Sequence, residues 1–170
     1  MDMDQELTED FIDAAVHDQP KAKRLLEAHP ELRDARWIHH ETVLHFLAVE
    51  GYADAVRFLG SLGFDPNAAN EFGDPPLIDV ATIGNGQVAE VLLAVGADPN
   101  ATSLTQDNVL HSAVRSGNAR LVELLLSAGA RADYVTEREE TVFDALPQEP
   151  RGRAAVEEVL VKHGVRQGAA

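Results

Sequence analysis

The sequence repeats itself every 33 residues, and this period constrains the fold more than any local motif does. The tetrapeptide Thr42-Val43-Leu44-His45 aligns with Pro75-Pro76-Leu77-Ile78 one period later and with Asn108-Val109-Leu110-His111 after a second period. In the same phase, Asp65-Pro66-Asn67-Ala68 recurs as Asp98-Pro99-Asn100-Ala101. A fixed period of this length is typical of a solenoid, in which each repeat buries its hydrophobic residues against its neighbours.

Glycines and leucines keep the same spacing. Residues that follow one another at this interval are Gly63, Gly96 and Gly129 in one set, and Leu26, Leu59, Leu92 and Leu125 in another. In these motifs the sequence resembles the ankyrin-repeat family from about residue 7 to residue 165. The resemblance implies an all-α fold, which is a solenoid of stacked antiparallel helix pairs with loops or β-hairpin fingers protruding from one edge.

We expect a single domain, residues 1–170, made of five repeats. These are an N-terminal cap at about residues 1–33, three central repeats at 34–68, 69–101 and 102–134, and an irregular C-terminal cap at 135–166. In the first repeat, Thr8 is predicted to cap a helix that ends at His17, and Pro20 is predicted to begin a second helix. Its outer face should be charged and exposed, as a terminal cap requires.

The last repeat departs most from the pattern. Its inner helix is predicted to start at Thr141 and to be shortened or bent by Pro147 and Pro150, because proline cannot continue a regular helix. An outer helix is expected at about residues 152–163. It should pack on the preceding repeat through Ala155, Val156, Val159 and Leu160.

The resemblance also implies how the inner helices begin. In the ankyrin family the threonine and histidine of a Thr-Pro-Leu-His tetrapeptide form hydrogen bonds around the first turn of the inner helix. This assigns the same role to Thr42 with His45, and to Asn108 with His111. The third repeat lacks the pair, since prolines and an isoleucine stand at these positions.

Composition and charge narrow the classes of partner. The chain has 29 acidic and 14 basic side chains, a formal net charge of −15, which repels nucleic acids and anionic membrane surfaces. A partner guided by electrostatics should therefore be a basic protein. There is no cysteine, no apolar run approaches ~18 residues, and the acidic N-terminus argues against a secretory signal. We therefore expect a cytoplasmic protein that does not enter a membrane.

One cluster raises a metal-dependent or enzymatic alternative. His39, His40 and Glu41 are adjacent and could in principle bind zinc. The spacing does not match the zinc-binding helix of metalloproteases, whose histidines are four residues apart, whereas His40 and His45 are five apart. His45 and His111 also recur with the repeat, which favours a structural role. We therefore predict no catalytic residue, no metal and no cofactor.

In the ankyrin family, loop tips and the exposed side of the inner helices usually hold partners. Carried onto this chain, the loop-tip residues are Ile38, His39, Glu41, Glu71, Phe72, Asp74, Leu104, Thr105, Asp107, Glu137, Arg138 and Glu140. The inner-helix residues are Val49, Glu50, Thr82, Ile83, Arg115 and Ser116. The hydrophobic members Ile38, Phe72, Ile83 and Leu104 are expected to form one strip along the loop edge inside an acidic rim. The alternative is that these four pack within the loops themselves.

The sequence thus favours a monomeric, non-catalytic module that binds a protein partner, with a basic partner preferred. A narrower version is a protein that neutralises or chaperones a basic toxin or nuclease, as an immunity protein would. Zinc analysis would separate this class from a metal-dependent function at His39, His40 and Glu41. A purely structural spacer is a third hypothesis, which requires that the loop tips bind nothing.

Overall fold

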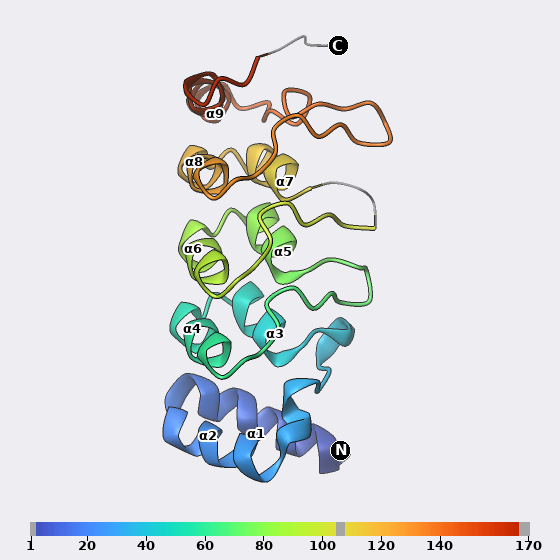
Figure 1. The fold of residues 1–170 in the computed structure, drawn as a ribbon, viewed down its shortest axis with the longest axis vertical. Helices are drawn as coiled ribbons and strands as arrows, with labels where there is room; N and C mark the ends of the chain where they lie inside the picture. The colour runs from blue at the N-terminus through green and yellow to red at the C-terminus, as the bar shows by residue number, and fades with distance from the viewer. Residues whose placement is uncertain (1–2, 105–107, 167–170) are drawn as a thin grey trace.

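The computed structural model of the protein describes residues 3–104 and 108–166, and it is a stack of helix pairs (Figure 1). Its α-helices are α1 (Met3–His17), α2 (Gln19–Ala28), α3 (Val43–Val49), α4 (Ala53–Ser61), α5 (Pro76–Ile83), α6 (Gly86–Ala94), α7 (Val109–Ser116), α8 (Ala119–Ser127) and α9 (Pro150–Lys162). Two short 3-10 helices, η1 (Pro30–Arg33) and η2 (Ile38–His40), lie between α2 and α3.

The helices form two layers. The inner helices α3, α5 and α7 pack on one another in order, and the outer helices α4, α6 and α8 do the same. The loop that leads from each outer helix to the next inner helix projects from one edge of the stack (Figure 1). This arrangement confirms the predicted all-α solenoid of stacked helix pairs.

Of the two predicted forms, loops or β-hairpin fingers, the described part of the chain has loops. No β-strand forms among residues 3–104 and 108–166. Instead, isolated antiparallel bridges join Arg36 to Thr42 and Thr102 to Asn108. We call these projecting loops fingers below.

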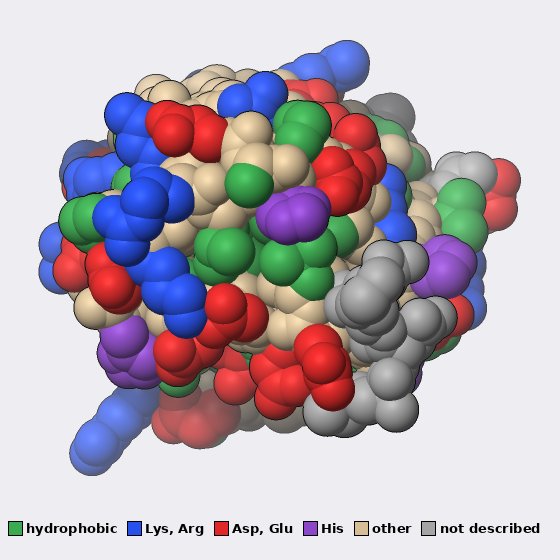
Figure 2. All heavy atoms as spheres, turned by 90° about the horizontal axis from the view of Figure 1, so that it is seen from below, with side chains coloured by type: hydrophobic (Ala, Val, Ile, Leu, Met, Phe, Trp, Pro, Cys, Tyr) green, Lys and Arg blue, Asp and Glu red, His purple; other side chains and the backbone are tan. Residues whose placement is uncertain are grey.

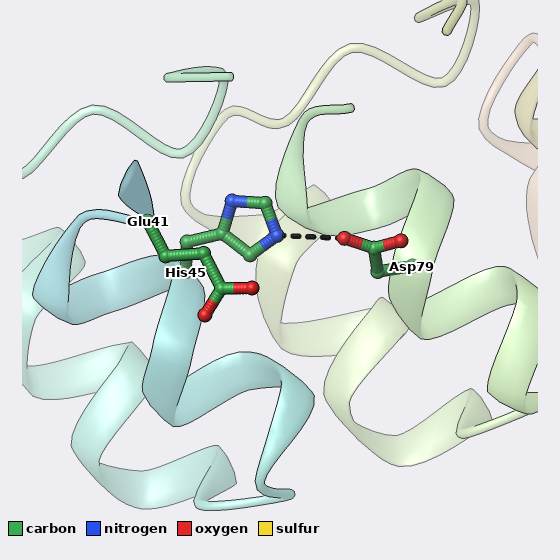
Figure 3. A group of neighbouring side chains, drawn as sticks. All are labelled: Glu41, His45 and Asp79. Carbon is green, nitrogen blue, oxygen red and sulfur yellow. Dashed lines mark hydrogen bonds and ion pairs between the residues drawn. The ribbon is translucent and has the colours of Figure 1, made fainter. Parts of the chain in front are cut away.

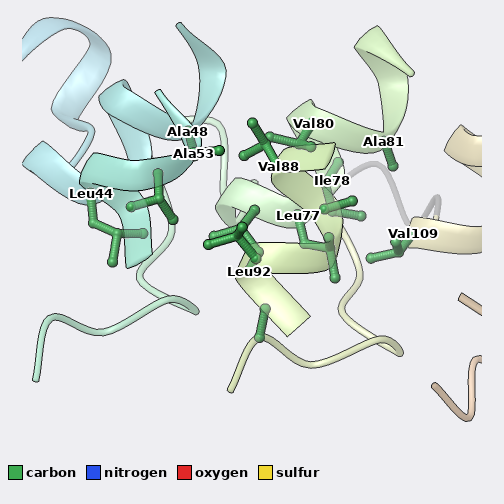
Figure 4. Packing of buried hydrophobic residues seen from close by; sticks show 14 of the residues in the cluster. Leu44, Ala48, Ala53, Leu77, Ile78, Val80, Ala81, Val88, Leu92 and Val109 are labelled. Carbon is green, nitrogen blue, oxygen red and sulfur yellow. The ribbon is translucent and has the colours of Figure 1, made fainter. Parts of the chain in front are cut away.

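The hydrophobic core is a continuous strip between the two layers (Figure 4). Leucines that share a position in successive repeats are at most 1% exposed; they are Leu44, Leu77 and Leu110 in the inner layer and Leu59, Leu92 and Leu125 in the outer layer. Each repeat therefore completes the core of the next one, which explains why the period is strict at these positions.

Polar side chains cap the inner helices where the sequence predicts them. The Thr42 hydroxyl accepts a hydrogen bond from the His45 backbone N–H at 3.1 Å, and the Asn108 side-chain oxygen accepts one from the His111 N–H at 2.9 Å. At Pro75, before α5, there is no side-chain cap. The proline that follows it lacks an N–H, which removes one of the donors that a cap would satisfy.

The first repeat corrects the expected helix start. α1 begins at Met3, and Thr8 lies inside the helix and is 5% exposed, so Thr8 is not a cap. Residues 3–7 include glutamine, glutamate and leucine, which are good helix formers, and Leu7 packs against the core. Local propensity therefore extends the helix past a residue that is common at helix starts.

The outer face of the first repeat is less polar than expected. Seen from the N-terminal end of the stack, hydrophobic side chains lie in the middle of the face and charged side chains surround them (Figure 2). The half-buried hydrophobic residues of α1 and α2 are Leu7, Ile12, Val16 and Leu25. The expectation of a charged end face is thus right for its rim and wrong for its centre.

The last repeat lacks the predicted inner helix. Residues 142–145 form only turns, and the Asp144 carboxylate accepts hydrogen bonds from both the backbone N–H and the hydroxyl of Thr141 at 2.7 Å. Such side-chain bonds compete with helix formation, and Pro147 prevents a further turn. α9 packs on α8 with Val156 and Leu160 buried, but Ala155 is exposed and does not contribute as predicted.

Candidate functional site

Successive loops project from one edge of the stack (Figure 1), and three of them, the fingers before α3, α5 and α7, close in similar ways. In the first finger, residues 37–41, the Trp37 N–H donates to the Glu41 carbonyl at 2.7 Å. In the second, residues 70–74, the Asn70 N–H donates to the Asp74 carbonyl at 3.1 Å. The third, residues 102–108, is closed by its bridge, and residues 105–107 lie outside the described residues. We call the exposed surface of these fingers the loop edge.

The first and second fingers contact each other directly. His39 Nδ1 lies 2.9 Å from Glu71 Oε1, and the Glu71 N–H donates to the His39 carbonyl at 3.0 Å. The ring of His39 lies 5.7 Å from that of Phe72, centroid to centroid. Arg36 adds a further link, because its guanidinium donates to the carbonyls of His40 and Ala69. The two fingers are therefore held as one surface.

The second and third fingers touch through Leu104 and Gly73. Gly73 has a φ of +76°, and a Cβ at this position would lie 2.2 Å from Leu104 Cγ. Gly73 follows Phe72 in the sequence. Only a glycine at this position lets Leu104 lie against the second finger. Leu104 thus lies against the second finger and is 74% exposed.

Hydrophobic side chains are exposed along the loop edge. Ile38 is 53% exposed, Phe72 56% and Leu104 74%. The alternative that they pack along the loops holds in part, because Phe72 lies against His39 and Leu104 against Gly73, while more than half of each side chain stays exposed. Together with the finger contacts, these exposures place three large hydrophobic side chains on adjacent, touching loops.

Ile83 does not belong to this row. It is 60% exposed but is the last residue of α5, whereas the second finger leads into the first residue of that helix. The rise of an α-helix separates the two ends by about 10 Å. The expectation of one strip with Ile83 in it is corrected, because the inner-helix positions lie at the far end of each inner helix.

Every predicted partner-binding residue that the structure describes is exposed or half-buried. The exposed ones are Ile38, His39, Glu50, Glu71, Phe72, Thr82, Ile83, Leu104, Arg115, Ser116, Glu137 and Arg138. The half-buried ones are Glu41, Val49, Asp74 and Glu140. Thr105 and Asp107 lie outside the described residues. Accessibility is thus compatible with the predicted surface, while its binding role stays a prediction.

The structure does not gather His39, His40 and Glu41 as a metal site. Among residues 3–104 and 108–166, the group of three potential ligands is instead Glu41, His45 and Asp79, whose donor atoms lie within 4.8 Å of one another (Figure 3). Sequence reasoning missed Asp79 because it considered clusters only within one repeat. The available signal was an acidic residue on the next inner helix, 34 positions after the histidine.

This cluster joins two repeats. His45 is fully buried on α3, and its Nε2 lies 2.9 Å from Oδ2 of Asp79 on α5. The same carboxylate oxygen accepts a hydrogen bond of 3.2 Å from the Asn70 amide, which itself accepts from the Phe72 and Asp74 backbone N–H groups. Asp79 therefore holds both the buried histidine and the asparagine that shapes the second finger.

The carboxyl group of Glu41 is the member of the cluster with a shifted pKa. Burial raises the pKa of Glu41 above its usual value, His45 opposes the shift and Asp79 adds to it. A carboxyl group whose pKa is raised by folding stabilises the folded state while it is protonated, and this contribution is lost as the pH rises through the folded pKa.

We therefore expect Glu41→Gln to raise the free energy of unfolding at neutral pH, measured with EDTA present. The gain should be small at pH 5, close to the unfolded pKa of 4.5, and should grow toward pH 8. Urea titrations at several pH values above the sequence pI of 4.7 measure this, with Glu50→Gln as the exposed control. A Glu41→Gln protein less stable than wild type at pH 8 contradicts the argument.

Comparison with known proteins agrees with the architecture. A family model described as "Ankyrin repeats (3 copies)" matches residues 11–103 and residues 44–138, which together span 128 of the 170 residues. The cyclin-dependent kinase 4 inhibitor B of Rattus norvegicus is 50% identical over 46 residues, 27% of this chain and 35% of that protein. The match to this curated relative thus spans about a third of its length. Because the family model covers most of a chain whose helix pairs stack at the same period, the protein belongs to the ankyrin-repeat family.

Proposed function

We propose that this protein is a non-catalytic interaction module that binds a basic protein partner through its loop edge. Ankyrin repeats generally mediate protein–protein interaction. The observation that carries the proposal is the row of Ile38, Phe72 and Leu104 on three touching fingers, each more than half exposed. Solvent alone does not favour three large hydrophobic side chains on adjacent loops, whereas a protein interface uses them as anchors.

The charge around this row supports a basic partner. Glu71 is exposed beside Phe72, Glu41 is half-buried at the end of the first finger, and the whole chain carries a net charge of −15. An acidic rim around apolar anchors attracts a basic surface at a distance, and the anchors then slow its release. The exposed inner-helix residues, such as Glu50 and Ile83, would extend the contact along the inner layer.

The named relative does not decide the partner. Its name says that it inhibits a cyclin-dependent kinase, but the similarity extends over 46 residues, little more than one 33-residue repeat. A match of that length is explained by the scaffold residues that all repeats share, so a kinase is not part of this proposal. The monomeric state and the cytoplasmic location stay predictions from the sequence. No described helix is both long and apolar enough to span a membrane.

Capture from native lysate followed by binding to the purified partner tests the proposal. The matched variants are Phe72→Ser with Leu104→Ser on the loop edge, and Val161→Ser, which changes an equally exposed hydrophobic residue on α9. We expect wild type and Val161→Ser to bind the same basic protein and the double variant to lose it. A partner that is acidic, or that ignores the double variant, contradicts the proposal.

A further inference from the structure

The cluster of Glu41, His45 and Asp79 combines an imidazole with two carboxylates from two repeats. Glu41 precedes α3, His45 lies on the first turn of α3, and Asp79 lies on the first turn of α5 (Figure 3). Their side chains meet because α3 packs against α5, and His45 and Asp79 lie in the first turns of these two helices. This set of nitrogen and oxygen donors is the kind that binds Zn²⁺ and neighbouring divalent transition-metal ions.

The distances between the donors are close to those that such an ion needs. All three donor atoms lie within 4.8 Å of one another, and His45 Nε2 already lies 2.9 Å from Asp79 Oδ2. With bonds of ~2.0–2.2 Å, the ligands of a tetrahedral zinc ion are ~3.4 Å apart. The half-buried Glu41 side chain can close the remaining gap by rotating about its own bonds, because no described hydrogen bond fixes its carboxylate.

The charges in the cluster also favour a cation. Glu41 and Asp79 are two acidic groups, and Asp79 disfavours the charged form of Glu41. The groups that act on the Glu41 carboxyl are the acids Asp79 and Glu50 and the histidines His39 and His45, with no lysine or arginine of the described residues among them. A divalent cation would replace this repulsion with attraction to both carboxylates.

The second ring nitrogen of His45 does not prevent metal binding. Nδ1 is buried and has no hydrogen-bond partner among the described residues. In a neutral imidazole that donates from Nε2 to Asp79, the Nδ1 lone pair is unsatisfied; with metal on Nε2, the N–H at Nδ1 is unsatisfied instead. A cost of this kind exists in both states, so it largely cancels from the free energy of metal binding.

We propose that Glu41, His45 and Asp79 bind a divalent transition-metal ion such as Zn²⁺, with solvent in its remaining coordination position. The ion would join the second and third repeats at the start of their inner helices. Because Asn70 connects Asp79 to the finger that carries Phe72, the site lies directly beneath the loop edge. This inference stands independently of the proposed partner.

Zinc titration of the chelator-treated protein, followed by calorimetry and thermal unfolding, tests the site. We expect wild type to bind one Zn²⁺ in preference to Mg²⁺ or Ca²⁺ and to melt at a higher temperature with it. Asp79→Asn should abolish this binding, and Glu41→Gln should weaken it at least tenfold. The ¹⁵N shift of the His45 Nε2 nucleus should change on zinc addition in wild type, which reports coordination directly.

Because the chain has seven histidines, controls must exclude adventitious surface sites. His39→Gln removes the exposed histidine that pairs with Glu71, and Glu50→Gln removes an exposed carboxylate of the same repeat; both should bind zinc as wild type does. Circular dichroism of each metal-free variant checks that it is folded. The proposal is overturned if wild type shows no binding up to millimolar zinc, if Glu41→Gln and folded Asp79→Asn bind unchanged, or if His39→Gln abolishes binding.

Discussion

Replacing Leu92 or Leu125 with alanine is expected to lower the free energy of unfolding by about 2–5 kcal/mol each. Both side chains are fully buried and belong to the strip of leucines that repeats along the outer layer. Alanine leaves a cavity that neighbouring helices cannot fill, since each packs against two others in the stack. A loss of this size approaches the whole stability of many domains of similar length.

Urea titrations monitored by circular dichroism and by fluorescence of the single tryptophan, Trp37, measure this effect. Coincident transitions would show that unfolding is cooperative, which a free energy of unfolding requires. The control is Glu90→Ala, an exposed position on the same helix as Leu92, which should change stability by less than about 0.5 kcal/mol. Equal, small effects at Leu92, Leu125 and Glu90 would mean that the outer-layer core is assigned wrongly.

Phe72→Ala should weaken binding of the partner by at least about 30-fold, which corresponds to about 2 kcal/mol. The Phe72 ring belongs to the second finger. It lies near the His39 ring, and Phe72 is followed in sequence by Gly73, which contacts Leu104. Losing a central anchor mainly speeds dissociation. Because the side chain is more than half exposed in the free protein, folding stability should change by less than about 1 kcal/mol.

Charge reversal at Glu50 should change the association rate of the partner, not its dissociation rate. Glu50→Lys changes an exposed residue at the C-terminal end of α3, where a positive charge does not oppose the helix dipole. It should slow association and reduce its dependence on salt, with little change in dissociation. Surface plasmon resonance at two salt concentrations separates the two effects. If substitutions at Phe72 and Leu104 leave the affinity for the partner unchanged, while substitutions on the outer helices lower it, the interface lies on the opposite face.

The 33-residue period predicted a solenoid, and the resemblance of its repeated motifs to the ankyrin-repeat family implied the all-α stack. Periodicity reports burial, and in a solenoid the same positions are buried in every repeat, so Leu59, Leu92 and Leu125 are assigned together. The caps of α3 and α7 were also accessible to sequence reasoning, because Thr42 and Asn108 act on backbone groups three residues away. A hydrogen bond between residues three positions apart can be predicted from the local sequence alone.

Irregular segments were harder, because competing local preferences decide them. The start of α1 depends on helix propensity outweighing the capping preference of Thr8, and the missing inner helix of the last repeat depends on Asp144 binding the backbone of Thr141. Sequence reasoning named Thr8 and Thr141 but gave no role to Asp144. For the first helix it predicted the wrong start. For the last repeat it predicted a shortened or bent inner helix, whereas the structure has only turns.

Contacts between repeats were decided only by the tertiary structure. Asn67, part of the repeated Asp-Pro-Asn-Ala motif, donates to the Gly96 carbonyl at 3.0 Å and accepts from the Asp98 N–H at 2.8 Å, a use that repetition alone does not reveal. In the same way His45 meets Asp79, and Leu104 rests on Gly73. Each contact joins residues about one period apart. The period shows that two repeats are neighbours, but which side chains meet depends on the spacing and rotation between those repeats, which packing of the whole stack sets.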